Sequence, residues 1–469
     1  MLRHTGKWDS AGLSGRNVAV IGLGASGFAA ARLALAKGGD VYVSDLRSDA
    51  ATAARGADLG MAGAAVEVGG HDLERVARAD LVVVSPGIPP DAPVLGSLAE
   101  RGVRWISEPE LAVRFYSGPL IAVTGTNGKT TTTLLVAHLL RSSGLRAAEG
   151  GNVGGGLAPA ASELALADEP PDWYVLEMSS FQLAGVETFR PDIGVVTNLS
   201  PDHLDRYADV DAYYADKARL FDNADGESVW VLPAGDESVA ALAGDAPGRR
   251  VYFGGAGGPQ GAGPESSAFE RGGSLVLRTE GEDEVLIGVE ELPLLGHHNR
   301  KNALAAALTA RLAGAAPAGI STGLRTIRPL PHRLEPVAER GGVLWVNDSK
   351  ATNVAATRSA LESVDRPVVL LLGGKDKGES FARLAPVLLG RARVVVAFGA
   401  TGPRAARELG DAVRVELVEG DLAAVVSTAA RLALPGDVVL LSPACSSFDM
   451  FESYEHRGRL FSELAREVA

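Results

Sequence analysis

A glycine-rich segment with a single lysine is the part of this sequence best suited to phosphate chemistry. It reads Val123-Thr-Gly-Thr-Asn-Gly-Lys-Thr130 and lies between an apolar run and a helical stretch. In a strand–loop–helix unit, the backbone N–H groups and the helix dipole attract phosphate. Lys129 would neutralise the outer phosphates, and the Thr130 hydroxyl suits a magnesium ion. The loop, shorter than the general phosphate-loop pattern, predicts an ATP site; the alternative is a surface turn with a solvated lysine.

Two further polar positions follow predicted strands. Glu177 ends an apolar run, and the segment Thr197–Asp205 follows the next one. Magnesium takes oxygen ligands, so Glu177 is a candidate ligand beside the phosphates. His203 could bind a second metal ion or a phosphate, or it could be a helix-capping or core histidine. Asp202 and Asp205 are candidate caps for the helix that follows.

A second glycine turn, Gly22-Leu-Gly-Ala-Ser-Gly27, follows the first apolar run, and Asp45 ends the next one. This combination fits a dinucleotide-binding fingerprint, in which the acidic residue holds a ribose hydroxyl. The same geometry serves any nucleotide diphosphate. Ser85-Pro-Gly-Ile88 offers another tight turn on the same edge. A purely structural role for these glycines is the alternative.

The last third of the chain contains three polar segments. Pro331-His-Arg333 places a permanently charged guanidinium beside a rigid turn, which suits a terminal phosphate. Asn347-Asp-Ser-Lys-Ala-Thr-Asn353 follows a predicted strand and is unusually polar for a loop. The stretch from Leu441 onward is predicted to be a strand, a tight turn and a helix, at whose N-terminus Ser446 and Ser447 would donate to an anion.

For two potentially reactive side chains, Lys217 and Cys445, the spacing alone indicates no function. Lys217 lies in a predicted helix, Ala212–Leu220, and its default interpretation is a solvated lysine. Cys445 has no base assigned to it, so a small buried thiol is expected.

Short apolar runs alternate with helical stretches along the chain, which is typical of parallel sheets covered by helices. Ligands of such sheets collect at the carboxyl ends of the strands, where these motifs fall. We expect three α/β domains, at residues 1–117, 118–329 and 330–469, with an exposed loop at Gly254–Ser267. Strands are predicted at Asn17–Ile21, Asp40–Ser44, Leu81–Ser85, Trp173–Glu177, Ile193–Asn198, Leu344–Asn347, Val368–Leu372, Val394–Phe398 and Val438–Ser442, with helices at Ser26–Lys37 and Asn299–Leu312.

The composition narrows the class of protein. The 469 residues contain 45 lysines and arginines against 58 aspartates and glutamates, a net charge of -13 that argues against nucleic-acid binding. One cysteine excludes an internal disulfide and fits a reducing compartment. The N-terminus lacks the apolar core of a signal peptide, and no apolar run approaches the length of a membrane span. We therefore expect a cytoplasmic enzyme that binds no membrane.

Taken in chain order, these segments resemble the Mur ligases, the ATP-dependent amide-forming enzymes of cell-wall peptide synthesis. The resemblance runs from about Val18 to the C-terminus. Two turns and the stretch Ser442–Gly458 favour the branch that adds D-glutamate to UDP-N-acetylmuramoyl-L-alanine. The motifs that carry the resemblance are Gly125–Thr130, Glu177 with Ser179-Ser180, Asn198–Asp205, His298-Asn299 with Asn302-Ala303, Pro331–Arg333 and Asn347–Asn353, and the two turns are Gly22–Gly27 and Ser85–Ile88.

The resemblance implies a Rossmann-like N-terminal domain for the UDP substrate, a P-loop-type central ATPase domain and a Rossmann-like C-terminal domain. The last would bind the amino acid and close on ATP. The implied cofactors are ATP and two Mg²⁺ ions. The implied partners are the two small-molecule substrates, UDP-N-acetylmuramoyl-L-alanine and D-glutamate, and the protein is expected to be a monomer. The expected reaction activates a carboxylate as an acyl phosphate, which the D-glutamate amine then attacks with release of phosphate.

Site residues are carried over by this resemblance. Catalysis is assigned to Lys129, His203, Lys217 and Arg333, and metal binding to Thr130, Glu177, His203 and Lys217, the last as a carbamylated lysine. ATP is assigned to Gly125, Thr126, Asn127, Gly128, Lys129, Thr130, Thr131, Asn299, Arg333 and Asp348. The UDP substrate is assigned to Gly24, Ala25, Ser26, Asp45, Ser85, Pro86, Gly87, Ile88 and Asn152, and the amino acid to Lys350, Thr352, Lys377, Ser447 and Tyr454.

The chain departs from the family in places. Pro233-Ala-Gly-Asp236 stands where an adenine contact is common, so that contact is not carried over. Either Lys375 or Lys377 could reach the amino acid, and Tyr454 replaces a common phenylalanine. Other interpretations are a related ligase for L-alanine or a diamino acid, a folylpolyglutamate synthase, an NAD-dependent oxidoreductase and a non-catalytic ATP-binding regulator.

Overall fold

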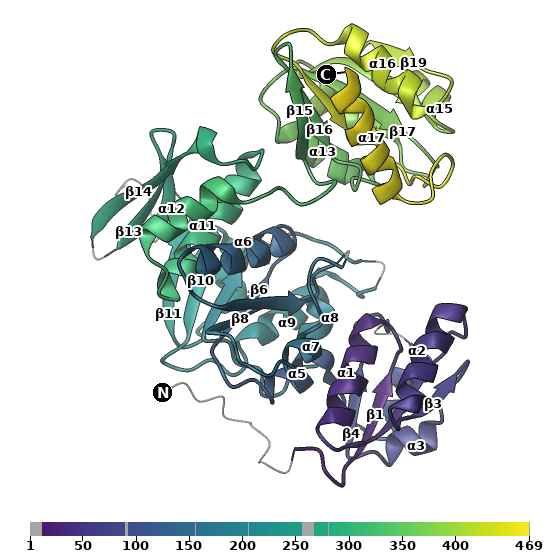
Figure 1. Ribbon diagram of the computed structural model, residues 1–469, viewed down its shortest axis with the longest axis vertical. Coiled ribbons are helices and arrows are strands. Elements are labelled where there is room, and N and C mark those ends of the chain that lie inside the picture. The colour runs from purple at the N-terminus through teal and green to yellow at the C-terminus, as the bar shows by residue number, and fades with distance from the viewer. Residues whose placement is uncertain are drawn as a thin grey trace. The chain divides into compact units, whose positions relative to one another are not determined.

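The protein is described as a computed structural model over residues 12–89, 92–154, 156–204, 206–255, 267–279 and 281–468. Across these ranges the strands form three sheets, which Figure 1 shows in chain order from purple to yellow. The chain divides into two compact units, one comprising 1–289 and 301–324 and the other 290–300 and 325–469. No helix in the described part is long and apolar enough to cross a bilayer.

The first sheet is wholly parallel and has the order β3-β2-β1-β4-β5, as in a Rossmann half. Alternate residues of its central strand enter two different cores, Val18 and Val20 on one face and Ala19 and Ile21 on the other. Both faces are therefore buried, which explains the continuous apolar runs. The strands are β1 (Asn17–Ile21), β2 (Asp40–Asp45), β3 (Ala65–Val68), β4 (Leu81–Val84) and β5 (Ile106–Ser107).

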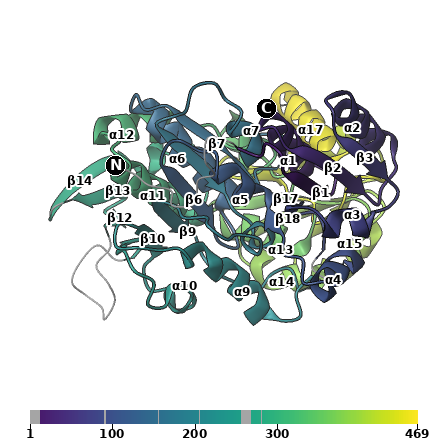
Figure 2. The same cartoon turned by 90° about the horizontal axis from the view of Figure 1, so that it is seen from below.

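Helices cover both faces of this sheet. Helices α1 and α2 contribute to one core and α3 and α4 to the other, and Figure 2 shows the two pairs on opposite sides of β1–β3. Asp49 and Asp72 cap α2 and α3 by accepting backbone N–H groups. The helices are α1 (Ala25–Ala36), α2 (Ala50–Met61), α3 (Leu73–Ala77) and α4 (Pro93–Glu100).

The second sheet has the order β14-β13-β12-β11-β10-β9-β6-β8-β7. Strands β6 to β12 run parallel, and β13 and β14 add an antiparallel edge. The strands are β6 (Leu120–Thr124), β7 (Ala147–Gly151), β8 (Trp173–Glu177), β9 (Ile193–Val196), β10 (Val229–Pro233), β11 (Arg249–Phe253), β12 (Ala268–Arg271), β13 (Ser274–Thr279) and β14 (Glu282–Gly288).

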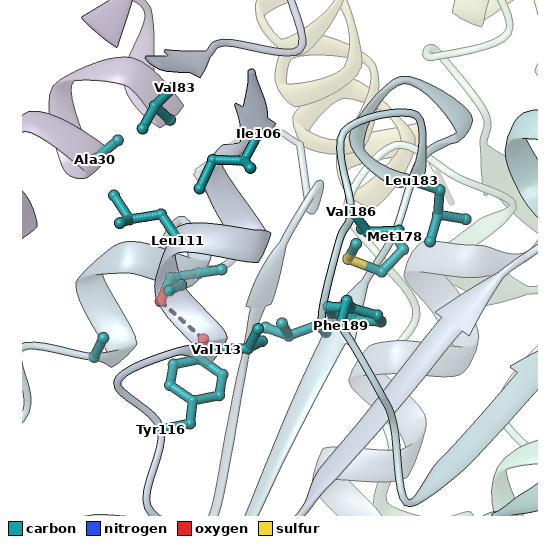
Figure 3. Packing of buried hydrophobic residues seen from close by; sticks show 14 of the residues in the cluster. Ala30, Val83, Ile106, Leu111, Val113, Tyr116, Met178, Leu183, Val186 and Phe189 are labelled. Carbon is teal, nitrogen blue, oxygen red and sulfur yellow. Dashed lines mark hydrogen bonds between the residues drawn. The ribbon is translucent and has the colours of Figure 1, made fainter. Parts of the chain in front are cut away.

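A short helix, α5, joins the first two sheets through a shared core. Figure 3 shows Leu111 of α5 near Val83 and Ile106, while Val113 lies toward Phe189. The other helices around the second sheet are α6 (Lys129–Ser142), α7 (Ala161–Leu164), α8 (Ser180–Leu183), α9 (Val210–Ala218), α10 (Glu237–Ala243), α11 (His297–Leu312) and α12 (Pro317–Thr326), with α5 at Glu108–Val113 and 3-10 turns at Arg219–Phe221 and Val289–Glu291.

The third sheet has the order β15-β16-β20-β17-β18-β19 and is parallel except for β15. One face packs against α13, α14 and α15, and the other against α16 and α17. The elements are β15 (Glu335–Arg340), β16 (Val343–Asn347), α13 (Val354–Glu362), β17 (Val368–Gly373), a 3-10 turn (Phe381–Leu384), α14 (Ala385–Leu388), β18 (Ala392–Phe398), α15 (Gly402–Leu409), β19 (Val415–Leu417), α16 (Leu422–Leu432), β20 (Val438–Leu441) and α17 (Tyr454–Val468).

The predicted three-part α/β fold is confirmed, with two local corrections. The last helix begins at Tyr454, so Ser446 and Ser447 lie in the turns that precede it and not at a helix N-terminus. Asp209, and not Asp202, caps α9 by accepting the Ala212 N–H at 2.8 Å. The other candidate cap, Asp205, and most of the predicted loop at 254–267 lie outside the described residues. The domain limits remain predictions.

Candidate active site

The glycine loop leaves the end of β6, whose neighbours are β8 on one side and β9 on the other. Where the connections that follow adjacent parallel strands run to opposite sides, they leave a crevice for a ligand at the strand ends. Gly125 (φ +136°) and Gly128 (φ +81°) adopt backbone angles that favour glycine. A Cβ at Gly125 would collide with the Thr197 hydroxyl, and one at Gly128 with the Asn302 side chain. The spacing of the two glycines therefore follows from the geometry of the loop.

The segment after β9 braces this loop through hydrogen bonds. Asn198 accepts the Asn127 N–H at 3.0 Å and returns its own amide to the Asn127 carbonyl at 2.9 Å. Thr197 donates to the same carbonyl at 2.6 Å. The Thr126 hydroxyl donates to the Ser200 carbonyl and accepts the Ser200 N–H, both at 3.0 Å. The loop is thereby held in place before any phosphate binds.

Two lysines converge on one carbonyl of the loop. Lys129, at the start of α6, donates from Nζ to the carbonyls of Gly125 at 3.1 Å and Thr126 at 2.8 Å. Lys217, on α9, donates from Nζ to the same Gly125 carbonyl at 2.7 Å. Lys217 is only 1% exposed, so its default interpretation as a solvated lysine is wrong. Sequence spacing could not reveal this burial.

The surroundings of Lys217 disfavour its charged form. Burial, followed by the positive charge of Lys129, lowers the pKa of Lys217 to about 7, against the attraction of Asp202 and Glu177. Its ammonium lies 4.8 Å from the ring centroid of Tyr213. The Tyr213 hydroxyl in turn donates to Thr126 at 3.3 Å. Near neutral pH a substantial fraction of this amine is therefore neutral and nucleophilic.

Oxygen donors lie at neighbouring strand ends, as a magnesium ion requires. Glu177 ends β8 directly beside Val123 of β6, and Thr130 lies in the first turn of α6. The Asn152 side chain, expected at the UDP substrate, donates to Glu177 at 3.1 Å. Within the described ranges no three His, Cys, Asp or Glu side chains form a metal cluster. Because magnesium usually keeps waters and phosphate oxygens, this small oxygen set fits the ion.

His203 lies in an aromatic patch beside the loop. Its backbone is left-handed (φ +55°), and its ring meets Phe181 and Tyr213 edge-on with centroids 5.2 and 5.9 Å apart. Its Nε2 lies 3.7 Å from a carboxylate oxygen of Asp202. These contacts aim the imidazole without burying it. The metal or phosphate role of His203 remains a prediction.

The first sheet brings its two turns together at the ends of β1 and β4. Gly24 is the N-cap of α1, with Ala25 and Ser26 in the first turn, and Ser85 directly follows β4. A Cβ at Gly22 would collide with Ser85, so the two turns touch. The remaining residues of the second turn, Pro86, Gly87 and Ile88, follow Ser85 and are fixed by the Ile88 N–H donating to the Ser85 carbonyl at 3.0 Å.

Asp45 is engaged within the protein. It accepts the Leu23 N–H at 2.6 Å and contacts the Arg47 guanidinium at 3.2 Å. Burial raises the pKa of Asp45, but the hydrogen bonds from Arg47 and Leu23 outweigh it and leave the pKa below its usual value. The Arg47 side chain is 59% exposed, so it is the charged group that this turn presents to solvent. Sequence reasoning missed Arg47, although its place two residues after Asp45 was a usable signal.

In the second unit, two of the predicted polar segments follow adjacent strands, and the loop that carries Lys375 and Lys377 follows a third. Strand β20 lies between β16 and β17, so the loops after Asn347, Leu441 and Gly373 meet at one edge. Asp348 accepts the Leu334 N–H at 3.2 Å and the Ser442 hydroxyl at 2.8 Å. Burial raises the pKa of Asp348 to about 7, against those hydrogen bonds.

Arg333 lies between two residues with left-handed backbone, His332 (φ +62°) and Leu334 (φ +43°). The Lys350 N–H donates to the His332 carbonyl at 3.1 Å, and Asn347 contacts the His332 ring at 3.0 Å. The turn that carries Arg333 is therefore fastened to the segment after β16. Asn299 lies in the same unit, in the first turn of α11, and donates its side-chain amide to Leu295.

The residues expected at the amino acid gather at this edge. The Lys350 ammonium lies 5.6 Å from the ring centroid of Tyr454, and Lys377 donates to the Thr352 hydroxyl at 3.3 Å. Lys375 instead pairs its backbone N–H with the Ser446 carbonyl at 2.9 Å. The Lys377 side chain thus contacts this group, and which of the two lysines reaches the amino acid remains a prediction. Ser447 is only 2% exposed, and its carbonyl accepts the Phe451 N–H.

A fully buried arginine, Arg457, ties these loops together and was missed from the sequence. It donates to the Ser349 hydroxyl at 2.9 Å, the Ser349 carbonyl at 2.8 Å and the Cys445 carbonyl at 3.2 Å. Burial lowers the pKa of Arg457 to about 10. Cys445 itself is buried, as expected. Only the tertiary structure shows that Arg457 spans two segments almost a hundred residues apart.

Comparisons with known proteins agree along nearly the whole chain. Residues 16–107 match the family model described as Mur ligase MurD-like, N-terminal domain, residues 123–310 the Mur ligase middle domain, and residues 332–445 the Mur ligase, glutamate ligase domain. The UDP-N-acetylmuramoylalanine--D-glutamate ligase of Acidobacterium capsulatum is 42% identical, covering 96% of both chains. That of Anaeromyxobacter dehalogenans is 45% identical, covering 97% of this chain and 99% of its own.

Solved structures are similar in fold. The UDP-N-acetylmuramate-alanine ligase MurC of Thermotoga maritima aligns with a TM-score of 0.56 at 21% identity, covering 97% of this chain and all of that one. The MurF ligase of Thermotoga maritima in complex with ADP aligns with a TM-score of 0.58 at 16% identity, covering 92% and 96% of the two chains.

Proposed function

Because the chain belongs to the Mur ligase family, we propose that it ligates D-glutamate to UDP-N-acetylmuramoyl-L-alanine at the expense of ATP, in peptidoglycan precursor synthesis. The observation that carries this proposal is the 42–45% identity to D-glutamate ligases over nearly the full chain. The geometry of the loop after β6 supports the ATP-dependent step.

The proposed reaction begins at a carboxylate, which is a poor electrophile. It attacks the γ-phosphorus of ATP, the bond to the ADP oxygen breaks, and an acyl phosphate forms. Such a transfer needs positioning and charge neutralisation more than covalent help. The N–H groups of residues 125–131 and the Lys129 ammonium would supply both, and Arg333 would add a second positive charge. The D-glutamate amine then attacks the acyl carbon, phosphate leaves with its bonding electrons, and the amine loses a proton.

Magnesium, when bound, neutralises the phosphate oxygens as a Lewis acid. Thr130 and Glu177 would hold it, since they place a hydroxyl in the first turn of α6 and a carboxylate at the end of β8, which pairs with β6. His203 and a carbamylated Lys217 would serve a second ion. Mg²⁺ use is general in this family, whereas the two-ion arrangement is our proposal.

Carbamylation of Lys217 is supported by its chemistry. A neutral amine attacks CO₂, a carbon–nitrogen bond forms, and one proton leaves, which converts the neutral amine into an anion. The buried, pKa-depressed amine of Lys217 suits this reaction. We expect enzyme equilibrated with ¹³C-bicarbonate to show a carbamate carbon resonance by NMR that Lys217→Ala lacks. An identical spectrum for the two proteins would contradict this assignment.

The remaining site residues are assigned by substrate. We propose that Gly24–Ser26, Asp45, the turn Ser85–Ile88 and Asn152 serve the UDP substrate. We propose that Lys350, Thr352, Lys377, Ser447 and Tyr454 surround D-glutamate, and that Asn299 and Asp348 serve ATP. A monomer in the cytoplasm, where ATP is available, is the proposed state, with domains at 1–117, 118–329 and 330–469.

The decisive experiment measures phosphate release and peptide product with ATP and UDP-N-acetylmuramoyl-L-alanine. D-glutamate, L-glutamate, L-lysine and diaminopimelate are supplied separately. We expect turnover with D-glutamate alone. Turnover with another amino acid would retain the ligase chemistry but reject the assigned substrate, and no turnover at all would reject the nucleotide substrate as well.

A further inference from the structure

The loop after β17, residues 374–382, carries the lysine proposed to meet D-glutamate. We call it the β17 loop. Its beginning is fixed to neighbouring strand ends, because Thr401 donates to the Gly374 carbonyl at 3.1 Å and Lys375 donates to Ser446 at 2.9 Å. The next residues, from Asp376 to Gly378, are exposed. Their conformation therefore depends on what holds them from outside the sheet.

Helix α15 presents two charged residues, one turn apart, to this exposed part. Arg404 contacts the Asp376 carboxylate at 2.7 Å and donates to the Glu379 carbonyl at 2.7 Å. Glu408 accepts the Ser380 hydroxyl at 2.8 Å and the Phe381 N–H at 2.6 Å. The two side chains thus hold successive parts of the β17 loop.

The two residues also support one another. Arg404 Nε lies 3.3 Å from Glu408, and the Arg404 guanidinium covers the Phe381 ring at 4.7 Å from its centroid. Their side chains are 24% and 25% exposed, less than the 51% of Asp376. A stacked guanidinium with two separate hydrogen-bond partners is a specific arrangement that lysine cannot reproduce.

The consequence concerns Lys377. Asp376 is held toward α15, while the adjacent Lys377 donates to Thr352 at 3.3 Å on the segment after β16. Fixing Asp376 on one side therefore limits the positions open to the Lys377 ammonium. A substrate group that meets a pre-positioned charge does not have to restrain a mobile side chain on binding.

We propose that Arg404, supported by Glu408, is a positioning residue that sets Lys377 for the carboxylate of the incoming amino acid. This rests on the proposed function. Arg404 acts through the β17 loop and does not touch the substrate. Its removal changes amino-acid binding and leaves the sites for ATP and the UDP substrate intact.

The test compares Arg404→Ala, Arg404→Lys and Arg407→Ala, the last an exposed arginine on the same helix. We expect Arg404→Ala to raise KM for D-glutamate about tenfold, with KM for ATP and for the UDP substrate within about twofold of wild type. Arg404→Lys should recover part of the loss because it keeps the charge for Asp376. Arg407→Ala should match wild type.

A second variant approaches the same contact from the loop. Asp376→Asn should raise KM for D-glutamate in the same direction, and the Arg404→Ala, Asp376→Asn double variant should lose less than the sum of the two effects. An unchanged KM for D-glutamate in Arg404→Ala would overturn the proposal. An equal rise in all three KM values would also overturn it, because that pattern marks general loss of structure.

The wild-type enzyme separates this inference from the proposed function. If wild type uses a different amino acid, the proposed substrate is wrong. The role of Arg404 is then tested with that amino acid: a rise in its KM alone supports the role, and an unchanged KM overturns it. If wild type uses no amino acid, both are overturned.

Discussion

Lys129 and Lys217 direct their ammonium groups to one oxygen, the Gly125 carbonyl, at 3.1 and 2.7 Å. Two like charges so close raise the free energy of the state in which both are protonated. Lys217 is the lysine whose pKa falls, because burial also removes its charge from water. Any change at Lys129 should therefore be felt at Lys217, and the two residues act as a pair.

Substitution of Lys129 tests the phosphate loop directly. We expect Lys129→Ala to lower kcat by about 10²- to 10³-fold or more, since it removes the positive charge beside the outer phosphates. The melting temperature should stay close to that of wild type, because the loop keeps its bonds to Asn198 and Ser200. A near-normal rate in this variant would reject the assignment of the loop to ATP.

Some of the site residues could be predicted from the sequence, and others could not. Gly125, Gly128 and Glu177 were predictable because backbone angles and strand ends leave a pattern in the sequence. The burial of Lys217 and the bridging by Arg457 depend on which segments meet in space. Spacing along the chain holds no signal for such contacts.

Among the elements, several strands with both faces covered were predictable, although the buried strand β10 was missed. Strands β1, β8, β16 and β17 were placed within a residue or so, because both faces are covered and their residues are continuously apolar. Edge strands such as β3 and the antiparallel β14 were missed, since polar residues interrupt them. The start of α17 was placed too early because the connection before it is rich in small residues.

Helix α5 is the element that fastens the first sheet to the second. Its residue Glu110 is fully buried and accepts the N–H groups of Glu187, Thr188 and Phe189 at 2.9–3.1 Å. It also accepts the Thr188 hydroxyl at 2.7 Å and pairs with Arg114 at 2.9 Å. A single carboxylate therefore satisfies three successive N–H groups and one hydroxyl of this loop.

Removal of this carboxylate should destabilise the first unit. We expect Glu110→Ala to lower the free energy of unfolding by about 3–5 kcal/mol, because it leaves several buried N–H groups without their acceptor and removes one of the two carboxylates that pair with the buried Arg114. Urea unfolding followed by tryptophan fluorescence measures the change. Glu100→Ala, at an exposed site on α4, should stay within about 0.5 kcal/mol of wild type. Equal midpoints for the two variants would contradict this role.

At the scale of the whole molecule, a second buried carboxyl makes stability depend on pH. Glu108 begins α5, is fully buried and accepts the Ser162 N–H. Burial raises the pKa of Glu108 from 4.5 to about 7, against the hydrogen bonds from Ser162. Between pH 4.5 and about pH 7, the folded protein therefore keeps a proton on Glu108 that the unfolded chain has lost. The stability contributed by this proton falls as the pH rises through that window and is absent above it.

The prediction is a pH-dependent difference between wild type and Glu108→Gln. The two should be similarly stable near pH 5, where Glu108 is protonated. By pH 8 the variant should be more stable by an amount on the order of a few kcal/mol, because it avoids a buried charge. Parallel urea curves across pH 5–8 give the difference. A constant gap over that range would contradict the raised pKa.

The order of the third sheet has a consequence for how the chain is made. Strand β20, near the C-terminus, lies between β16 and β17, which precede it in the sequence. During synthesis, β16 and β17 leave the ribosome with unpaired edges facing each other and no strand to fill the gap. The edge of the third sheet that we propose binds the amino acid is therefore completed only when β20 has been made. A chain cut short before Val438 would present two open edges to its neighbours.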